Sequence, residues 1–142
     1  MEKPFDCTGK YDAVVLLHVL EHLFKPEETL ERLSALLHDG GVLIGGSPTM
    51  PSLLAAAWQP LLRRKAAHID VKGHTHLSVI TPERLRRFAQ QHAMEVELLA
   101  GTFFCRWSDF ILENTKTWLR ANLLWGALFP SLGGEVYFCI RK

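Results

Sequence analysis

Short apolar segments alternate along the chain with longer segments whose apolar positions have helical spacing. Segments 12–17 and 41–44 consist almost wholly of aliphatic residues, a pattern typical of strands covered on both faces of a sheet. Segment 95–99 begins with alternating polar and apolar residues, which predicts a strand with one face partly exposed to water. A last apolar run, 136–140, follows two glycines and completes a set of four predicted strands.

Four helices are predicted among these strands. Pro26 begins the clearest one, because Glu27 and Glu28 occupy its first turn and leucines follow at helical spacing. Pro82 begins another helix with a similar start. The four predicted ranges, in chain order, are 26–38, 52–64, 81–93 and 108–126.

The resulting order is strand, helix, strand, helix, helix, strand, helix, strand. Short joints between a strand, a helix and the next strand favour a parallel pair with a right-handed crossover. We therefore expect the α/β class with an open, mostly parallel sheet. The length of 142 residues suffices for one domain, so residues 1–142 are expected to form a single unit.

Composition and charge restrict the function classes. Sixteen Lys and Arg against fifteen Asp and Glu give a net charge of +1, too little for the positive field that non-specific nucleic-acid binding needs. Three cysteines without a C-x-x-C pair favour a reducing compartment, and the polar start has no secretory pattern, so we expect a cytoplasmic protein. Glycines and prolines interrupt the uncharged stretch 40–62, so no transmembrane segment is expected.

The most distinctive segment is 17–23, Leu-His-Val-Leu-Glu-His-Leu, which directly follows the first predicted strand. Ligands bind at the carboxyl ends of strands in open α/β sheets, so this segment is well placed for a site. Its His18, Glu21 and His22 match the H-x-x-E-H pattern of inverted zinc peptidases, whose histidines bind Zn²⁺ from one helical face. The strand-like residues before His18 argue against a helix there. A third interpretation makes Glu21 and His22 capping and hydrogen-bonding residues of a tight turn.

The chain from Tyr11 onward resembles the class I S-adenosylmethionine-dependent methyltransferases, particularly their type 11 and ubiquinone-biosynthesis-like group. Four features carry the resemblance in the family's order: an aspartate that opens a strand, a V-L-E-H-L segment, a leucine-rich helix after Pro26, and L-x-x-G-G at 37–41 before the next strand. Segment 73–78 also resembles the family's loop before a later helix. The resemblance implies a partial Rossmann-like methyltransferase fold, a mostly parallel open sheet whose antiparallel last strand is inserted between the two preceding strands.

The resemblance also implies S-adenosylmethionine as cofactor and a small or lipid-linked methyl acceptor. It places Leu17, His18 and Val19 near the methionine part of the cofactor, with contacts mainly through their backbone. His22 is expected to face the reaction centre as the candidate catalytic residue. The residues expected to line the acceptor side are Pro48, His74 and His76. The two loop histidines have the chemistry of a base or a metal ligand, but ordinary hydrogen bonding is the commoner role, and no metal ligand is predicted.

One family feature has no counterpart in the sequence. These enzymes bind their cofactor mainly through a glycine-rich loop after the first strand, and ten residues before Tyr11 cannot hold the strands that should precede it. We therefore expect the C-terminal half of a methyltransferase domain, inactive alone. The alternative is a non-catalytic remnant that serves as an assembly module. In either case the first strand is expected to present an open edge that a second copy, a terminal segment or a partner chain covers.

Overall fold

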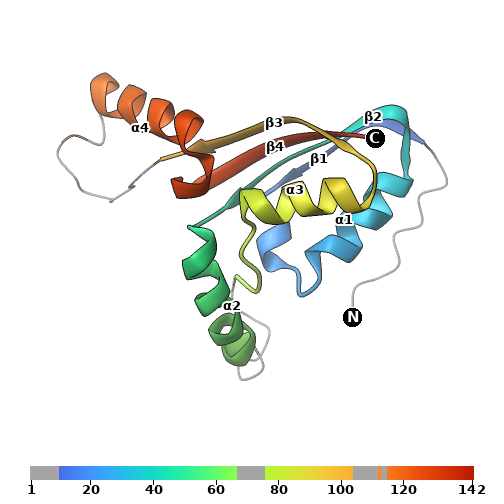
Figure 1. Ribbon diagram of the computed structural model, residues 1–142, viewed down its shortest axis with the longest axis horizontal. Helices are drawn as coiled ribbons and strands as arrows, with labels where there is room; N and C mark the ends of the chain where they lie inside the picture. Colours follow the sequence, from blue (N-terminus) through green and yellow to red (C-terminus); the bar gives the residue numbers. More distant parts are fainter. Residues whose placement is uncertain (1–9, 67–75, 104–111, 113–114) are drawn as a thin grey trace.

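The computed structural model describes residues 10–66, 76–103, 112 and 115–142 (Figure 1). The strands are β1 (Tyr11–Leu17), β2 (Leu37–Pro48), β3 (Glu95–Thr102) and β4 (Glu135–Arg141). The helices are α1 (Pro26–Ala35), α2 (Ser52–Ala66), α3 (Pro82–Gln91) and α4 (Lys116–Leu128). Two short 3₁₀ turns, η1 (Leu20–His22) and η2 (Pro130–Leu132), follow β1 and α4.

The four strands form one sheet in the order β1-β2-β4-β3. β1 and β2 are parallel, as a short strand-helix-strand connection favours, while β4 is antiparallel to both β2 and β3. Three strands therefore point one way, and the last strand lies between two of them in the opposite direction. The predicted α/β class, the open sheet and the inserted antiparallel last strand are confirmed.

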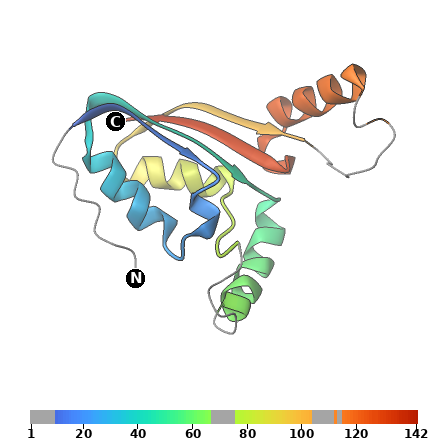
Figure 2. The same cartoon turned by 180° about the vertical axis from the view of Figure 1, so that it is seen from behind.

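The hydrophobic core lies between the sheet and the helices α1 and α3, which cover the same face (Figures 1 and 2). Leu30 of α1 and Leu85 and Phe88 of α3 are at most 3% exposed. They belong to one buried cluster with Leu43 of β2 and Phe138 of β4. The apolar stripes predicted for both helices thus pack against the two central strands.

The opposite face of the sheet is uncovered along β1 and β2 in the described part of the chain (Figure 2). Val15 is 60% exposed and Leu17 is 57% exposed, so the prediction that the first strand is covered on both faces is wrong. The strand carries apolar side chains on both of its faces, but among the described residues only one face is covered by helices. Strand pairing places Val15 beside Ile44, Ile44 beside Cys139 and Cys139 beside Leu98, and we call these four residues the apolar row.

The cysteine of the apolar row behaves as an apolar residue. Burial raises the pKa of the Cys139 thiol, and its hydrogen bond to the Glu97 carboxylate, with a sulfur–oxygen distance of 3.4 Å, raises that pKa further. The thiol therefore stays protonated at neutral pH, which makes it a poor nucleophile and a poor metal ligand. The row is consequently suited to packing rather than to chemistry.

Element boundaries differ from the predictions mainly at β2. α1 ends at Ala35 because the N–H of Tyr11 donates to the carbonyl oxygen of Leu36 at 2.8 Å and draws the next residue into the sheet. β2 extends beyond the predicted 41–44 at both ends, and Gly40 bends it with φ +81°, a conformation that glycine adopts without strain. Of the predicted helix 108–126, residues 108–111, 113 and 114 lie outside the described residues, Thr115 is the N-cap of α4, and residues 116–126 fall within α4.

Candidate functional site

A sharp turn follows β1 at the carboxyl end of the sheet. The N–H of His18 donates to the carbonyl oxygen of Gly46 at 2.8 Å, so pairing with β2 continues one residue beyond the strand. His18 then adopts φ +52°, a left-handed conformation that is uncommon outside glycine. The chain consequently turns into η1, and Leu20 and Glu21, which are 0% and 1% exposed, enter the interior.

Glu21 places a buried carboxylate at the centre of this region. Its Oε2 accepts a hydrogen bond from Oγ of Ser47 at 2.9 Å. Its Oε1 lies 3.3 Å from Nδ1 of His18 and 3.9 Å from Nε2 of His22. Because a carboxylate removed from water needs polar or charged partners, these contacts from the turn and from β2 are what make its burial tolerable.

The segment that precedes α3 is hydrogen-bonded to the same turn. The N–H groups of Leu77 and Ser78 both donate to the carbonyl oxygen of Glu21, at 2.6 and 3.0 Å. Gln59 of α2 binds the other side of this segment. Its Nε2 donates to the carbonyl oxygen of Leu77 at 2.8 Å, and its Oε1 accepts from the N–H of Val79 at 2.9 Å. Segments far apart in sequence are thereby fixed side by side.

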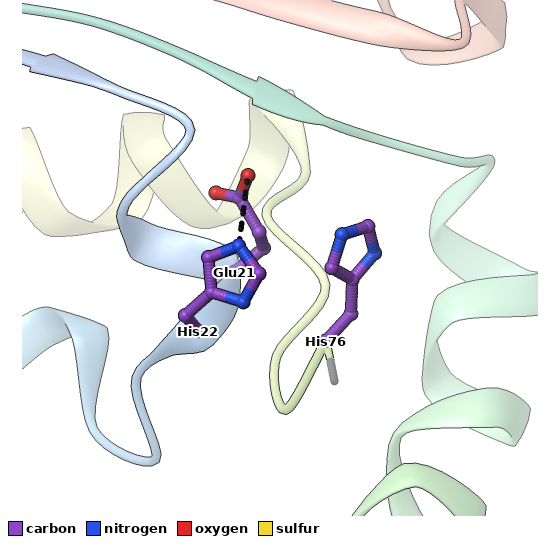
Figure 3. A group of neighbouring side chains, drawn as sticks. All are labelled: Glu21, His22 and His76. Atoms are coloured by element: carbon purple, nitrogen blue, oxygen red, sulfur yellow. Dashed lines mark ion pairs between the residues drawn. The ribbon is translucent and has the colours of Figure 1, made fainter. Parts of the chain in front are cut away.

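Two histidines meet beside Glu21 as a result (Figure 3). The ring centroids of His22 and His76 are 5.2 Å apart and the ring planes meet at 67°, so the rings contact edge to face. One potential ligand atom from each of Glu21, His22 and His76 lies within 4.8 Å of the others. We call these three side chains the Glu-His-His cluster, and it combines the donor types that bind transition metals.

A cavity of about 100 Å³ opens beside this cluster at the carboxyl ends of β1 and β2. Thr49, at the end of β2, lines it and is only 8% exposed, and its hydroxyl has no hydrogen-bond partner among the described residues. The wall combines a carboxylate, an imidazole and residues with hydroxyl groups with the apolar side chains of Pro48 and Trp58, which suits a ligand with both polar and apolar parts. Residues of the wall include Glu21, Pro48, Thr49, Trp58, His76 and Ser78.

Most of the predicted site residues gather at this end of the sheet. Residues 17–19 lie at the end of β1 and their side chains are exposed. Pro48 and His76 line the cavity, and His22 contacts His76. His74 lies outside the described residues.

The sequence pattern points to Glu21 only as part of a tight turn or of a zinc-peptidase motif, and it does not indicate Ser47 or Thr49 as site residues. Their only signal is that the apolar run of the second strand gives way to the polar triplet Ser-Pro-Thr, at a strand end where ligands bind.

The structure also bears on the zinc-peptidase interpretation. That mechanism needs His18 and His22 on one face of an α-helix. Here His18 follows a strand with a left-handed φ of +52°, and η1 is a 3₁₀ turn of three residues. The required helical face is therefore not formed in this segment.

Comparisons with known proteins agree with this architecture. A family model described as a methyltransferase domain matches residues 2–98. No curated protein sequence matches the chain detectably.

Two solved structures share the fold at low identity. A chain of the complex between the Haloferax volcanii Trm112 methyltransferase activator and a protein described as a methyltransferase is 13% identical, with a TM-score of 0.58, over 99% of this chain and 57% of that one. The [4+2]-cyclase SpnF is 12% identical, with a TM-score of 0.51, over 99% of this chain and 53% of its own. The chain thus spans little more than half the length of either. Because one of the two is a cyclase, the fold alone does not determine the reaction.

Proposed function

Since this chain belongs to the methyltransferase-domain family, we propose that it forms the acceptor-side half of a class I, S-adenosylmethionine-dependent methyltransferase. The acceptor we propose is a small or lipid-linked molecule. The observation that carries the proposal is the cavity at the carboxyl ends of β1 and β2, bounded by Glu21 and His76. In an open α/β sheet this is where a ligand is expected to bind.

The proposed roles follow from the position of each residue. S-adenosylmethionine supplies an electrophilic methyl group when it is bound. The backbone of residues 17–19 would hold the methionine part, because the turn at His18 exposes this stretch at the strand end. Pro48 and His76 would orient the acceptor, and His22 would face the reaction centre and receive the acceptor's proton. Glu21, 3.9 Å from Nε2 of His22, would stabilise the charge that such a proton brings.

We further propose that these 142 residues bind the cofactor only weakly by themselves. They contain no G-x-G-x-G segment, which in this family brings backbone N–H groups close to the cofactor. β1 is also an edge strand in the described part of the chain, so no neighbouring strand supplies such a loop.

Nuclear magnetic resonance of the isotope-labelled chain tests both the cofactor site and its weakness. S-adenosylhomocysteine should shift the amide resonances of residues 17–19 selectively, with a dissociation constant of about 1 mM or weaker. Uridine at the same concentration is the control and should leave these resonances in place. Unmoved resonances would remove the proposed cofactor role of the β1 turn, whereas micromolar binding would show that the glycine-rich loop is not needed.

A second candidate function, an assembly module, is favoured by the apolar row. Val15, Ile44 and Leu98 are 60%, 38% and 54% exposed and lie in register across the sheet, next to the unpaired edge of β1. An open strand edge beside an exposed apolar face is a surface on which another chain can add a strand or a layer. We propose that a second copy or a partner chain covers it.

Light scattering coupled to gel filtration tests this surface. The wild-type chain should have at least twice the monomer mass, and Ile44→Glu in the apolar row should reduce it to the monomer mass. Leu53→Glu is the matched control, because Leu53 lies on α2 and is 88% exposed, and it should not change the mass. A monodisperse wild-type monomer would rule out self-association through this face.

In the part of the chain that the structure describes, no helix is long and apolar enough to cross a membrane. The cytoplasmic location and the identity of the acceptor stay predictions. Fractionation of cells that express a tagged chain tests the location.

A further inference from the structure

We propose that the Glu-His-His cluster of Glu21, His22 and His76 binds a divalent transition metal ion, with Zn²⁺ the best match. The three side chains offer one carboxylate oxygen and two imidazole nitrogens within 4.8 Å of one another (Figure 3). This donor set suits Zn²⁺ and its first-row neighbours rather than Mg²⁺ or Ca²⁺, which prefer oxygen ligands alone.

Glu21 is prepared for this role by its surroundings. Its side chain is 2% exposed, so the carboxylate has lost nearly all of its water. Ser47 fixes Oε2 with a hydrogen bond of 2.9 Å, while Oε1 faces Nδ1 of His18 at 3.3 Å and Nε2 of His22 at 3.9 Å. A metal-binding carboxylate is usually held by a hydrogen bond of this kind, and a cation at Oε1 would stabilise the buried charge.

His76 is held beside Glu21 by the backbone that follows it. The carbonyl oxygen of Glu21 accepts from the N–H groups of both Leu77 and Ser78, and Oγ of Ser78 donates to the carbonyl oxygen of Leu23 at 2.7 Å. The segment that carries His76 is therefore attached to the same turn that carries the other two donors. Metal binding would add a side-chain link to this backbone link.

Small rotations of the histidine side chains can bring the three donor atoms of the cluster to the spacing that a metal ion requires. Donors around a tetrahedral Zn²⁺ lie roughly 3.3 Å apart, given metal–ligand distances near 2 Å. His22 has a side chain 37% exposed and His76 is exposed, so burial does not confine either ring. The donor atoms now lie within 4.8 Å of one another, so they must approach by up to about 1.5 Å, which rotation of the two histidine side chains can supply while the buried Glu21 stays in place.

The cavity supplies what a metal site with three protein ligands needs, which is space for a further ligand. It holds about 100 Å³ and is lined by both Glu21 and His76. Thr49 and Ser78 also line this cavity, so polar residues border the space for that ligand. With an ion bound, His22 is a ligand rather than the proton acceptor. Ion binding itself does not depend on the proposed methyl transfer.

Titration of the metal-free 142-residue chain with Zn²⁺ and Co²⁺ tests the site. We expect one ion per chain, with Co²⁺ absorption bands typical of nitrogen and oxygen donors. His76→Ala should weaken binding at least about tenfold, and because His76 is exposed the variant should keep the fold. His38→Ala is the matched control, since His38 is also exposed and lies at the other end of β2, and its affinity should equal that of the wild type.

Three results would overturn the inference. One is equal affinity of the wild type and His76→Ala for Zn²⁺, and another is displacement of Co²⁺ by equimolar Mg²⁺. The third is a thiolate charge-transfer band, which would assign the ion to cysteines. Glu21→Gln should also weaken binding about tenfold, but this residue is buried, so the exposed histidine decides the outcome. The S-adenosylhomocysteine titration is run without metal, so failure of one proposal is distinguishable from failure of the other.

Discussion

Replacement of Phe138 by alanine should lower the free energy of unfolding by about 3–5 kcal/mol. Phe138 is 1% exposed and lies on β4, the strand that pairs with both β2 and β3. Its ring occupies the space over Gly45, where an added Cβ would lie 2.2 Å from Cζ of the phenylalanine. Because glycine has no side chain to fill that space, truncation leaves a cavity that the neighbours cannot close.

Urea unfolding followed by circular dichroism measures this loss. The dependence of the free energy on urea concentration should keep its slope while the midpoint falls. Phe24→Ala is the control, because Phe24 is 58% exposed, and it should change the free energy by less than about 0.5 kcal/mol. A loss below about 1 kcal/mol for Phe138→Ala would mean that the ring is not packed as described.

Replacement of Gly126 by alanine should lower the free energy of unfolding by about 1–3 kcal/mol, although helix propensity alone predicts a gain of about 1 kcal/mol. α4 approaches β3 through this glycine, and an added Cβ would lie 2.2 Å from the carbonyl oxygen of Gly101 and 2.5 Å from Cα of Thr102. Both obstructing atoms belong to the backbone, so they cannot rotate away as a side chain would. Overlap therefore outweighs propensity, and α4 must move off the sheet.

Tryptophan fluorescence reports this displacement, since Trp118 and Trp125 both lie on α4. The emission of Gly126→Ala should shift before unfolding, and its urea midpoint should fall. Ala127→Gly measures the effect of helix propensity alone, because Ala127 is exposed. It should lower the free energy of unfolding by about 1 kcal/mol without a shift in tryptophan emission. A gain in stability for Gly126→Ala would contradict the close contact between α4 and β3.

The elements could be predicted from the sequence because each has a local cause. α1 and α3 each begin at a proline, α3 with Thr81 as its cap, and both carry an apolar stripe. The inserted place of β4 came from the family resemblance rather than from periodicity. The exposed outer face of β1 could not be foreseen, because an apolar run records which residues a strand carries and not whether a second layer lies over them.

The position of the candidate site at a strand end could be expected from the sequence, but the contacts that assemble it could not. His18 and His22 follow the carboxyl end of a predicted strand, the end at which open α/β sheets bind ligands. The burial of Glu21 depends on the left-handed turn at His18, and the contact between His22 and His76 depends on hydrogen bonds from Leu77 and Ser78 to Glu21. Contacts between segments that are far apart in the sequence produce no periodic pattern of residues, so the sequence does not predict them.

The position of β4 has a consequence for synthesis of the chain. β2 and β3 do not pair directly, since each is hydrogen-bonded to β4 between them. On a ribosome β1, α1 and β2 emerge first and have all the residues needed to pair, whereas β3 has no strand partner until residues 135–141 have left the exit tunnel. Both edges of β3 therefore stay open while residues 103–134 are made, and nascent chains on one messenger could pair with each other there. Slower translation across that interval would prolong the exposure of β3 and with it the opportunity for such pairing between nascent chains.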